Sequence, residues 1–303
     1  MTATEATKHK RVLECKLAIV TGASRGIGAA VCANLASKGC HIVMNYTSAS
    51  SASKTETLAR ELEAQHGIKC LPVQADMSTE TGPAHIIHQA RQHFSVPPPP
   101  SSSSSADDDR VLIFQIDILI NNAGVGGKHP LPEATSSEFT RLYNINVRGP
   151  LLLMTAALPY LPHDRSGRIV NLSSVSSSCG FTGDSIYGGT KAALEAMTRS
   201  WARELAERAT VNAVNPGPVA TDMYWANPPE FQASMAHWTK NTPLAKIRGD
   251  VDPKEILDGA ELAGGRPGYD HEVAGVIAML CTPDSAWCTG SVICANGGMK
   301  FSV

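Results

Sequence analysis

A tyrosine and a lysine four residues apart are the first candidates for chemistry in this chain. Tyr187 and Lys191 lie in the segment YGGTK, and residues at this spacing share one face of a helix. A free tyrosine has a pKa of about 10, too high for easy proton exchange at neutral pH. A nearby ammonium stabilises the phenolate and lowers that pKa, so Tyr187 could donate a proton to a carbonyl oxygen or accept one from an alcohol. Two such residues can also be ordinary surface neighbours, so the motifs before them matter.

A serine-rich stretch before this pair could supply a second hydrogen-bond donor to the same substrate oxygen. A fixed hydroxyl stabilises the charge that develops on a reacting oxygen. Serines are also common in loops, where they cap backbone groups, so only some of these need a chemical role. The candidates are Ser173, Ser174, Ser176, Ser177 and Ser178.

A glycine-rich turn near the start of the chain has the pattern of an anion-binding site. Residues 21–28 read TGASRGIG and stand where an apolar segment passes into a helical pattern. Gly22 permits a tight turn, Gly26 lets backbone N–H groups approach a pyrophosphate, and Gly28 allows close packing of helix on strand. The helix N-terminus adds unpaired donors and the positive end of its dipole. In this context the motif predicts a dinucleotide site.

The order of these motifs resembles that of the short-chain dehydrogenase/reductase family. The glycine turn is followed by NNAG at residues 121–124 and then by the Tyr-Lys pair. The resemblance covers residues 16–298, apart from two irregular segments. It implies hydride transfer between a nicotinamide cofactor and a carbonyl or secondary alcohol, and most members of the family are homotetramers.

The resemblance also implies roles for single residues. Among the serines it selects Ser174, thirteen residues before the tyrosine. It assigns a fourth catalytic position to Asn146, which would kink its helix and hold a water in a proton relay, with Asn144 as the competitor. Lys191 would also hold the nicotinamide ribose. The implied catalytic set is Tyr187, Lys191, Ser174 and Asn146.

The residues after the second expected strand favour NADP(H) over NAD. An acidic residue there would bind the free ribose 2′-hydroxyl of NAD, but residues 44–48 read MNYTS. Arg25 in the glycine turn can instead meet a 2′-phosphate through charge-assisted hydrogen bonds, although a solvated turn arginine is the alternative. By resemblance Asp76 contacts the adenine edge, with a helix N-cap as the alternative. The full expected cofactor set is Gly22, Ser24, Arg25, Gly26, Ile27, Gly28, Asn45, Tyr46, Thr47, Asp76, Met77, Asn122, Ala123, Gly124, Lys191, Pro216, Gly217, Val219 and Thr221.

The elements that must position these residues alternate between strand-like and helix-like segments. This alternation is typical of an α/β fold with a doubly wound parallel sheet of the Rossmann type. We expect one domain over 16–303 with about seven strands, after an N-terminal tail at 1–15. Strands are expected at 17–21, 41–46, 69–75, 117–121, 168–172, 210–214 and 291–295. Helices are expected up to Gly39 and at 51–66, 137–158, 187–208 and 272–281.

Two segments interrupt the regular spacing. Residues 96–109 contain four prolines, five serines and three aspartates, which predicts a solvated loop, while translated intron sequence at 96–115 is the alternative. Residues 220–268 are too long for an ordinary connection and predict a substrate lid. DPKEI, within the lid, and YDHEV, after it, could each begin the last helix. We assign that helix to YDHEV, because the residues that follow it match the family pattern.

The lid is rich in large apolar residues although aromatics make up only 5% of the chain. Such a cluster predicts an apolar pocket wall, and hence a hydrophobic ketone or alcohol, such as one that contains a ring, rather than a sugar. The alternative is that these residues anchor a long loop to the core. They are Met223, Tyr224, Trp225, Phe231, Met235 and Trp238.

Composition narrows the class of partner. A net charge of -2 favours neither nucleic acid nor an anionic membrane, and no apolar run is long enough to span a bilayer. Eight cysteines without metal spacing predict reduced thiols, no metal site and a cytoplasmic location. We therefore expect a small-molecule carbonyl or alcohol substrate and a homotetramer or homodimer. Alternatives that keep the fold are a non-redox step, such as cyclisation or epimerisation, and a nucleotide-binding regulator.

Overall fold

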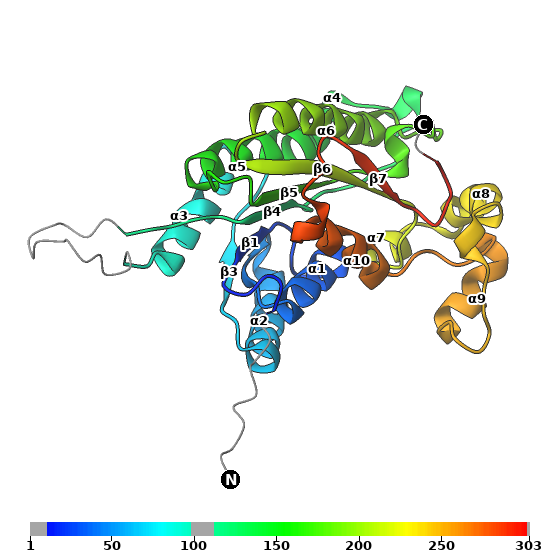
Figure 1. The fold of residues 1–303 in the computed structure, drawn as a ribbon. Helices are drawn as coiled ribbons and strands as arrows, with labels where there is room; N and C mark the ends of the chain where they lie inside the picture. The colour runs from blue at the N-terminus through cyan, green and yellow to red at the C-terminus, as the bar shows by residue number, and fades with distance from the viewer. Residues whose placement is uncertain (1–10, 98–111, 302–303) are drawn as a thin grey trace, which may run out of the picture.

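Seven parallel strands form a single sheet in the computed structural model, which describes residues 11–97 and 112–301 (Figure 1). Their order across the sheet is β3-β2-β1-β4-β5-β6-β7. The expected Rossmann-type sheet is therefore confirmed. The strands are β1 (Leu17–Val20), β2 (His41–Tyr46), β3 (Cys70–Gln74), β4 (Ile118–Asn121), β5 (Gly167–Leu172), β6 (Ala209–Pro216) and β7 (Val292–Ala295).

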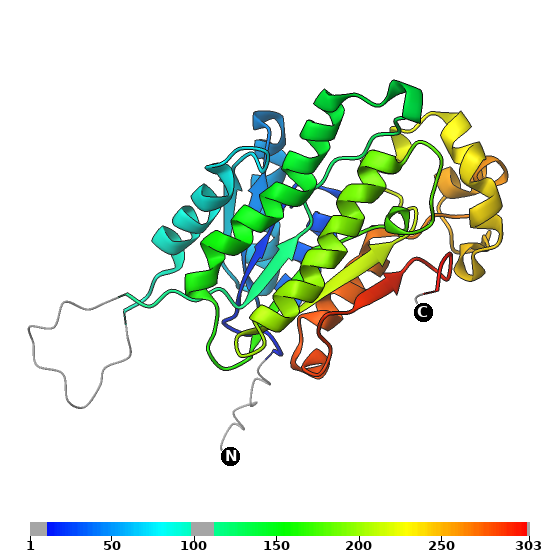
Figure 2. The same ribbon diagram turned by 90° about the horizontal axis from the view of Figure 1, so that it is seen from above.

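Helices cover both faces of this sheet (Figures 1 and 2). One apolar core joins the sheet to α1 (Gly26–Ser37), α2 (Ala52–His66) and α10 (Asp270–Leu280). The other joins it to α3 (Gly82–Phe94), α5 (Gly149–Ala157) and α6 (Ser185–Glu204). The central strands are buried on both faces and are almost wholly apolar, as expected of a parallel sheet.

The sheet order reverses its direction between β1 and β4. After β1 the chain adds β2 and β3 on one side, then returns to place β4 on the other side of β1. The loops that leave the carboxyl ends of β1 and β4 therefore diverge and open a crevice. In doubly wound folds such a crevice is where ligands bind.

Helix α3 was missed at the sequence level, where residues 76–95 had no assigned element. It begins at Gly82-Pro83, since proline is favoured in the first helical turn, and it buries Ile86, Ile87 and Ala90 against the sheet. The predicted loop at 96–109 lies mostly outside the described residues. Of its flanks, Val96 and Ile113 form an antiparallel bridge.

The predicted lid is a helical subdomain rather than a loop. It consists of α7 (Asp222–Trp225), α8 (Pro229–Lys240) and α9 (Lys254–Ala263), and Figures 1 and 2 show α8 and α9 side by side at one end of the molecule. Both DPKEI and YDHEV begin helices, and the second leads to the last strand, as predicted. Ala220 N–H donates to Gly268 O (2.9 Å) and Gly268 N–H to Pro218 O (2.9 Å), so the two ends of the lid meet beside β6.

Residues 11–15, predicted as tail, belong to the domain. Leu13 is buried in the core, and the Arg11 guanidinium donates to His66 O (2.6 Å) at the end of α2. Among the described residues, no helix combines the length and apolar character needed to cross a bilayer.

Candidate active site

A cavity of about 1120 Å³ opens at the carboxyl ends of the central strands. The glycine turn after β1 forms one end, and the lid forms the other. All but two of the residues predicted for the site line it, the exceptions being Asn45 and Asn146. Side chains from the first and the last third of the chain therefore meet around one space.

The glycine turn forms as tightly as its sequence implies. Gly22 and Gly26 have φ angles of +64° and +53°, which residues with a Cβ rarely adopt. A Cβ on Gly28 would lie 2.2 Å from Gly22 O, so α1 can begin this close to the turn only with glycine there. Asn122 Nδ2 donates to Gly22 O (3.1 Å) and Thr21 O (2.8 Å), which ties the turn to the NNAG segment after β4.

Asn45, which was predicted to belong to the cofactor set, does not line the cavity. It is fully buried at the end of β2, where its Nδ2 donates to Val73 O (3.3 Å) and Ala75 O (3.0 Å). Its Oδ1 accepts from Gly22 N–H (3.3 Å). Asn45 therefore supports the glycine turn from behind, because its short side chain can satisfy several buried backbone groups at once.

The rim beside the glycine turn carries Arg25, whose side chain is 63% exposed. Its guanidinium lies 3.6 Å from the Asp222 carboxylate at the start of α7, which is similarly exposed. Ser48 and Ser51 also line the cavity here, and their hydroxyls are 3.1 Å apart. Both serines were missed at the sequence level, although the serine run that follows β2 was a visible signal.

Asp76 lies in the turn after β3 and is not a helix N-cap, since Thr81 holds that position for α3. Its Oδ1 accepts from Ser78 N–H (2.8 Å), as a turn-capping residue does, and it also lines the cavity. Its neighbour Met77 does so as well. The loop after β3 is therefore held locally while its side chains face the crevice.

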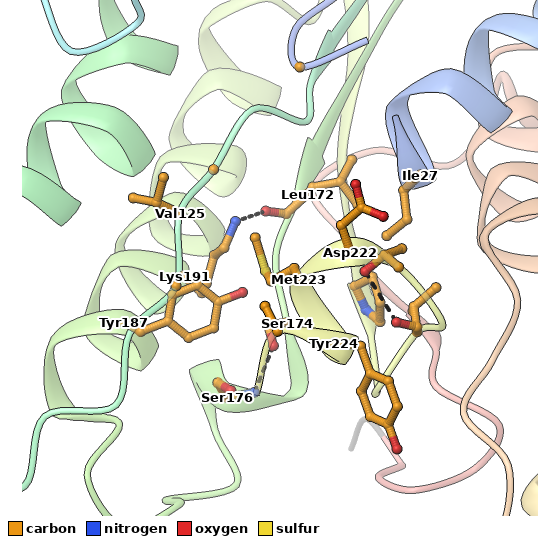
Figure 3. Close-up of a pocket in the computed structure, with 18 of the residues that line it drawn as sticks. Ile27, Val125, Leu172, Ser174, Ser176, Tyr187, Lys191, Asp222, Met223 and Tyr224 are labelled. Atoms are coloured by element: carbon orange, nitrogen blue, oxygen red, sulfur yellow. Dashed lines mark hydrogen bonds between the residues drawn. The ribbon is translucent and has the colours of Figure 1, made fainter. Parts of the chain in front are cut away.

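Tyr187, Lys191 and Ser174 converge on the middle of the cavity (Figure 3). Tyr187 and Lys191 stand one turn apart near the start of α6, and Ser174 follows β5. Lys191 Nζ donates to Leu172 O (2.7 Å) and lies 5.8 Å from the centre of the tyrosine ring. Ser174 Oγ accepts from Ser176 N–H (3.2 Å), which fixes the serine side chain in its turn.

Burial, rather than the lysine charge, dominates the acidity of the tyrosine. It raises the pKa of Tyr187 to about 12, the Asp184 charge acts in the same direction, and a hydrogen bond with Ser174 opposes both. Burial also lowers the pKa of Lys191 to about 8, because it disfavours the charged ammonium. The expected lowering of the Tyr187 pKa by Lys191 is thus not the controlling effect in the protein alone.

Asn146 lies behind the cavity wall instead of lining it. It sits in a π-helical turn, Asn144–Arg148, between α4 (Ser136–Tyr143) and α5, so the predicted single helix is interrupted there. Its side chain exchanges two hydrogen bonds with the backbone of Val125 (2.9 Å each), and its Nδ2 also donates to Thr190 Oγ1 (3.1 Å). Thr190 Oγ1 in turn donates to Tyr187 O (2.7 Å). Asn146 thereby connects the loop after β4 to the helix of Tyr187.

Aromatic and charged side chains share the lid end of the cavity. Five of the six apolar lid residues line it, whereas Trp225 lies outside and packs edge-on against Tyr224. Phe181 adds to the wall with a perpendicular contact to Trp238 (5.3 Å between centroids).

The polar part of this end was not predicted from the sequence. Lys128 Nζ lies 5.4 Å from the centre of the Phe231 ring, so the loop after β4 contacts the lid across the cavity. Asp184, three residues before Tyr187, lines the cavity without an ion pair among the described residues. Burial raises the pKa of Asp184, while Ser176, Lys128 and His129 lower it. A substrate in this end therefore meets hydrogen-bonding groups as well as rings.

Two family models match the chain. One described as short chain dehydrogenase matches residues 16–96, and one described as Enoyl-(Acyl carrier protein) reductase matches residues 110–260. The chain is 52% identical to an L-xylulose reductase of Aspergillus niger, over 96% of this chain and 99% of that protein. It is 48% identical to an L-xylo-3-hexulose reductase of Hypocrea jecorina, over 97% and 99%.

Solved structures share the fold over nearly the whole chain. A blue fluorescent protein from a metagenomic library, in complex with NADPH, is 32% identical with a TM-score of 0.76, over 96% of this chain and 100% of that one. A short chain dehydrogenase from Burkholderia cenocepacia, in complex with NADP, is 27% identical with a TM-score of 0.75, over 95% and 99%.

Proposed function

The chain belongs to the short-chain dehydrogenase/reductase family, and we propose that it is an NADP(H)-dependent reductase of a polyhydroxylated ketone, such as a ketose. The observation that carries this proposal is the convergence of Tyr187, Lys191 and Ser174 on the cavity that begins at the glycine turn. The identity of about half to two sugar reductases over nearly their full length supports the substrate class.

The residues around the glycine turn fit NADP(H). The cradle at Gly28 leaves no room for a Cβ, and the first N–H groups of α1 would face a pyrophosphate bound there. Arg25 stands at the rim, where its charge suits a 2′-phosphate, and no acidic residue follows β2 to favour a free 2′-hydroxyl. Two solved relatives hold NADPH or NADP.

The bound cofactor would supply a hydride to the carbonyl carbon. Tyr187 donates its proton to the carbonyl oxygen, so that a ketone and NADPH, with that proton, give a secondary alcohol and NADP⁺. A pKa of about 12 keeps the tyrosine protonated at neutral pH, which suits reduction. Ser174 donates a hydrogen bond to the same oxygen, and Lys191 would hold the nicotinamide ribose of a bound cofactor and contribute positive charge.

Polar side chains at the lid end support a hydroxylated substrate. Asp184 can accept hydrogen bonds from hydroxyl groups, and Lys128 can donate to them. Asp184 is half-buried and forms no ion pair among the described residues. Its carboxylate has therefore lost part of its hydration, which hydrogen bonds from substrate hydroxyl groups or from water can replace. An apolar ketone in this position would offer the carboxylate no hydrogen bond in addition to the one from Ser176.

A hydrophobic ketone is the second candidate, and the aromatic wall favours it. Phe181, Phe231 and Trp238 enclose one side of the cavity. Sugar-binding sites also use aromatic faces, so the wall alone does not decide between the two substrates.

The test follows NADPH absorbance with the purified protein across a panel of ketoses and cyclic aromatic ketones, with NADH in parallel. We expect turnover of ketoses with NADPH, and a loss of at least about 100-fold in the Tyr187→Phe protein, because its proton donor is gone. Reduction of aromatic ketones alone would favour the second candidate. Product formation without a proportional absorbance change would point to a non-redox step, and NADPH binding without any product would favour a regulator.

Association into a homotetramer or homodimer is a further part of the proposal. Ala196 is exposed on α6, beside half-buried Ala192 and Met197, and the two small alanine side chains allow another helix to pack closely. Light scattering after size exclusion tests this, and a monomer at assay concentration would reject it.

A further inference from the structure

Glu195 joins both ends of the loop that carries Ser174 to the helix that carries Tyr187. Its Oε1 accepts a hydrogen bond from Ser173 Oγ (2.5 Å) and another from Ser177 Oγ (2.7 Å). Glu195 follows Lys191 by four residues on α6, so both face the end of β5. Neither cofactor nor substrate is needed to explain these contacts, and Glu195 does not line the cavity.

The two serines bracket the proposed carbonyl-polarising hydroxyl. Ser173 directly precedes Ser174, and Ser177 ends the 3-10 turn Val175–Ser177 that follows it. Ser174 is the N-cap of that turn, and its Oγ is held by Ser176 N–H (3.2 Å). One carboxylate oxygen therefore fixes the five-residue loop at both ends.

Two further contacts hold the neighbouring strand to the same helix. Lys191 Nζ donates to Leu172 O (2.7 Å), and Asn171 Nδ2 donates to Thr198 Oγ1 (2.8 Å). These contacts position β5 itself, whereas the Glu195 carboxylate reaches past the strand to the loop. Short hydrogen bonds to a carboxylate are stronger than bonds between neutral groups, so this contact is suited to hold a loop in place.

We propose that Glu195 is a positioning residue that sets the location of Ser174 relative to Tyr187 through its hydrogen bonds to Ser173 and Ser177. The proposal rests on the proposed function, in which both side chains act on one carbonyl oxygen. A displacement of about 1 Å between such groups can lower a rate about 100-fold. Glu195 touches no reacting atom and acts only through the loop.

The first measurement uses the free protein and does not depend on activity. Hydrogen exchange is followed over residues 172–178 in wild type, Glu195→Ala, Glu195→Gln and the control Glu204→Ala. Glu204 is an exposed carboxylate at the end of the same helix. We expect faster exchange in this loop for Glu195→Ala, near wild-type exchange for Glu195→Gln, which keeps the acceptor oxygen, and no change for the control. Unchanged loop exchange in Glu195→Ala would overturn the proposal.

The second measurement is kinetic. We expect Glu195→Ala to lower kcat by about 10- to 100-fold, with the Kd of NADPH within about twofold of wild type, and the double variant Ser173→Ala/Ser177→Ala to match it. In a Ser174→Ala background, Glu195→Ala should cost little more, since the group that it positions is absent. An equal further loss in that background, or a lowered melting temperature with unchanged kcat, would show a purely structural role. If wild type and Tyr187→Phe are equally inactive on every ketone, the proposed function fails, and the exchange result still decides the role of Glu195 in the loop.

Discussion

Replacing Gly28 with alanine probes the closest approach in the cofactor cradle. The added Cβ would lie 2.2 Å from Gly22 O and 2.6 Å from Asn122 Nδ2. The first distance is about 1.2 Å short of an ordinary contact of 3.4 Å, and its partner is a backbone oxygen that has no rotamer to change. Helix α1 must therefore move away from the turn.

The expected cost follows from this displacement. Overpacking of this kind lowers the free energy of unfolding by about 1–3 kcal/mol. The same shift moves the N–H groups of α1 away from the pyrophosphate. Each hydrogen bond to a charged group contributes about 1.5–3 kcal/mol, so the loss of even one raises the Kd of NADPH by at least about tenfold.

A glycine in another helix supplies the matched control. At Gly275 in α10 an added Cβ would meet no atom within 4 Å, so alanine there should raise the free energy of unfolding by about 0.5–1 kcal/mol. Urea denaturation measures stability, and nucleotide fluorescence measures NADPH binding. Wild-type stability and affinity in Gly28→Ala would refute the packing argument.

Three other predictions concern charge. Arg25→Ala should weaken NADPH binding by about 10- to 100-fold and leave NADH binding unchanged, because only NADPH carries the 2′-phosphate. Fluorescence titrations measure both affinities, and equal losses for the two nucleotides would contradict this prediction. For wild type, kcat/KM for NADPH should fall as the pH rises through about 8, since the buried Lys191 ammonium loses its proton there, and a flat profile from about pH 6 to about pH 10 would oppose the assignment. Asp184→Asn removes a charge that raises the pKa of Tyr187, so the rate of alcohol oxidation, which needs the phenolate, should reach its plateau at lower pH; an unmoved profile would show that the two groups do not interact.

Local patterns were enough to predict the sheet and much of the cavity. The turn at residues 21–28 and the Tyr187–Lys191 pair depend on backbone geometry and on helical spacing, which are properties of a few neighbouring residues. The central strands β1 and β4 are buried on both faces, so each is a nearly continuous apolar run that can be recognised in the sequence alone. Sequence reasoning therefore found the fold class, and all but two of the residues that it predicted for the site line the cavity.

Contacts between distant segments decided the rest. Asn45 lies in a motif expected to touch the cofactor, yet its carboxamide turns inward because Gly22, Val73 and Ala75 present backbone groups that it can pair. Lys128 reaches the lid ring of Phe231 across the cavity, about a hundred positions along the chain. No local pattern encodes such a pairing.

The sequence by itself determined which groups are available for proton transfer, since Tyr187 and Lys191 stand out by type and spacing and the family resemblance selects Ser174 among five serines. Only the tertiary structure decided how acidic they are and how firmly they are held. Burial raises the pKa of the tyrosine and lowers that of the lysine, and Glu195 fixes the serine loop from a helix eighteen or more positions away. The physical reason is that desolvation and hydrogen bonding depend on what surrounds a group in space, whereas composition and spacing describe only its neighbours along the chain.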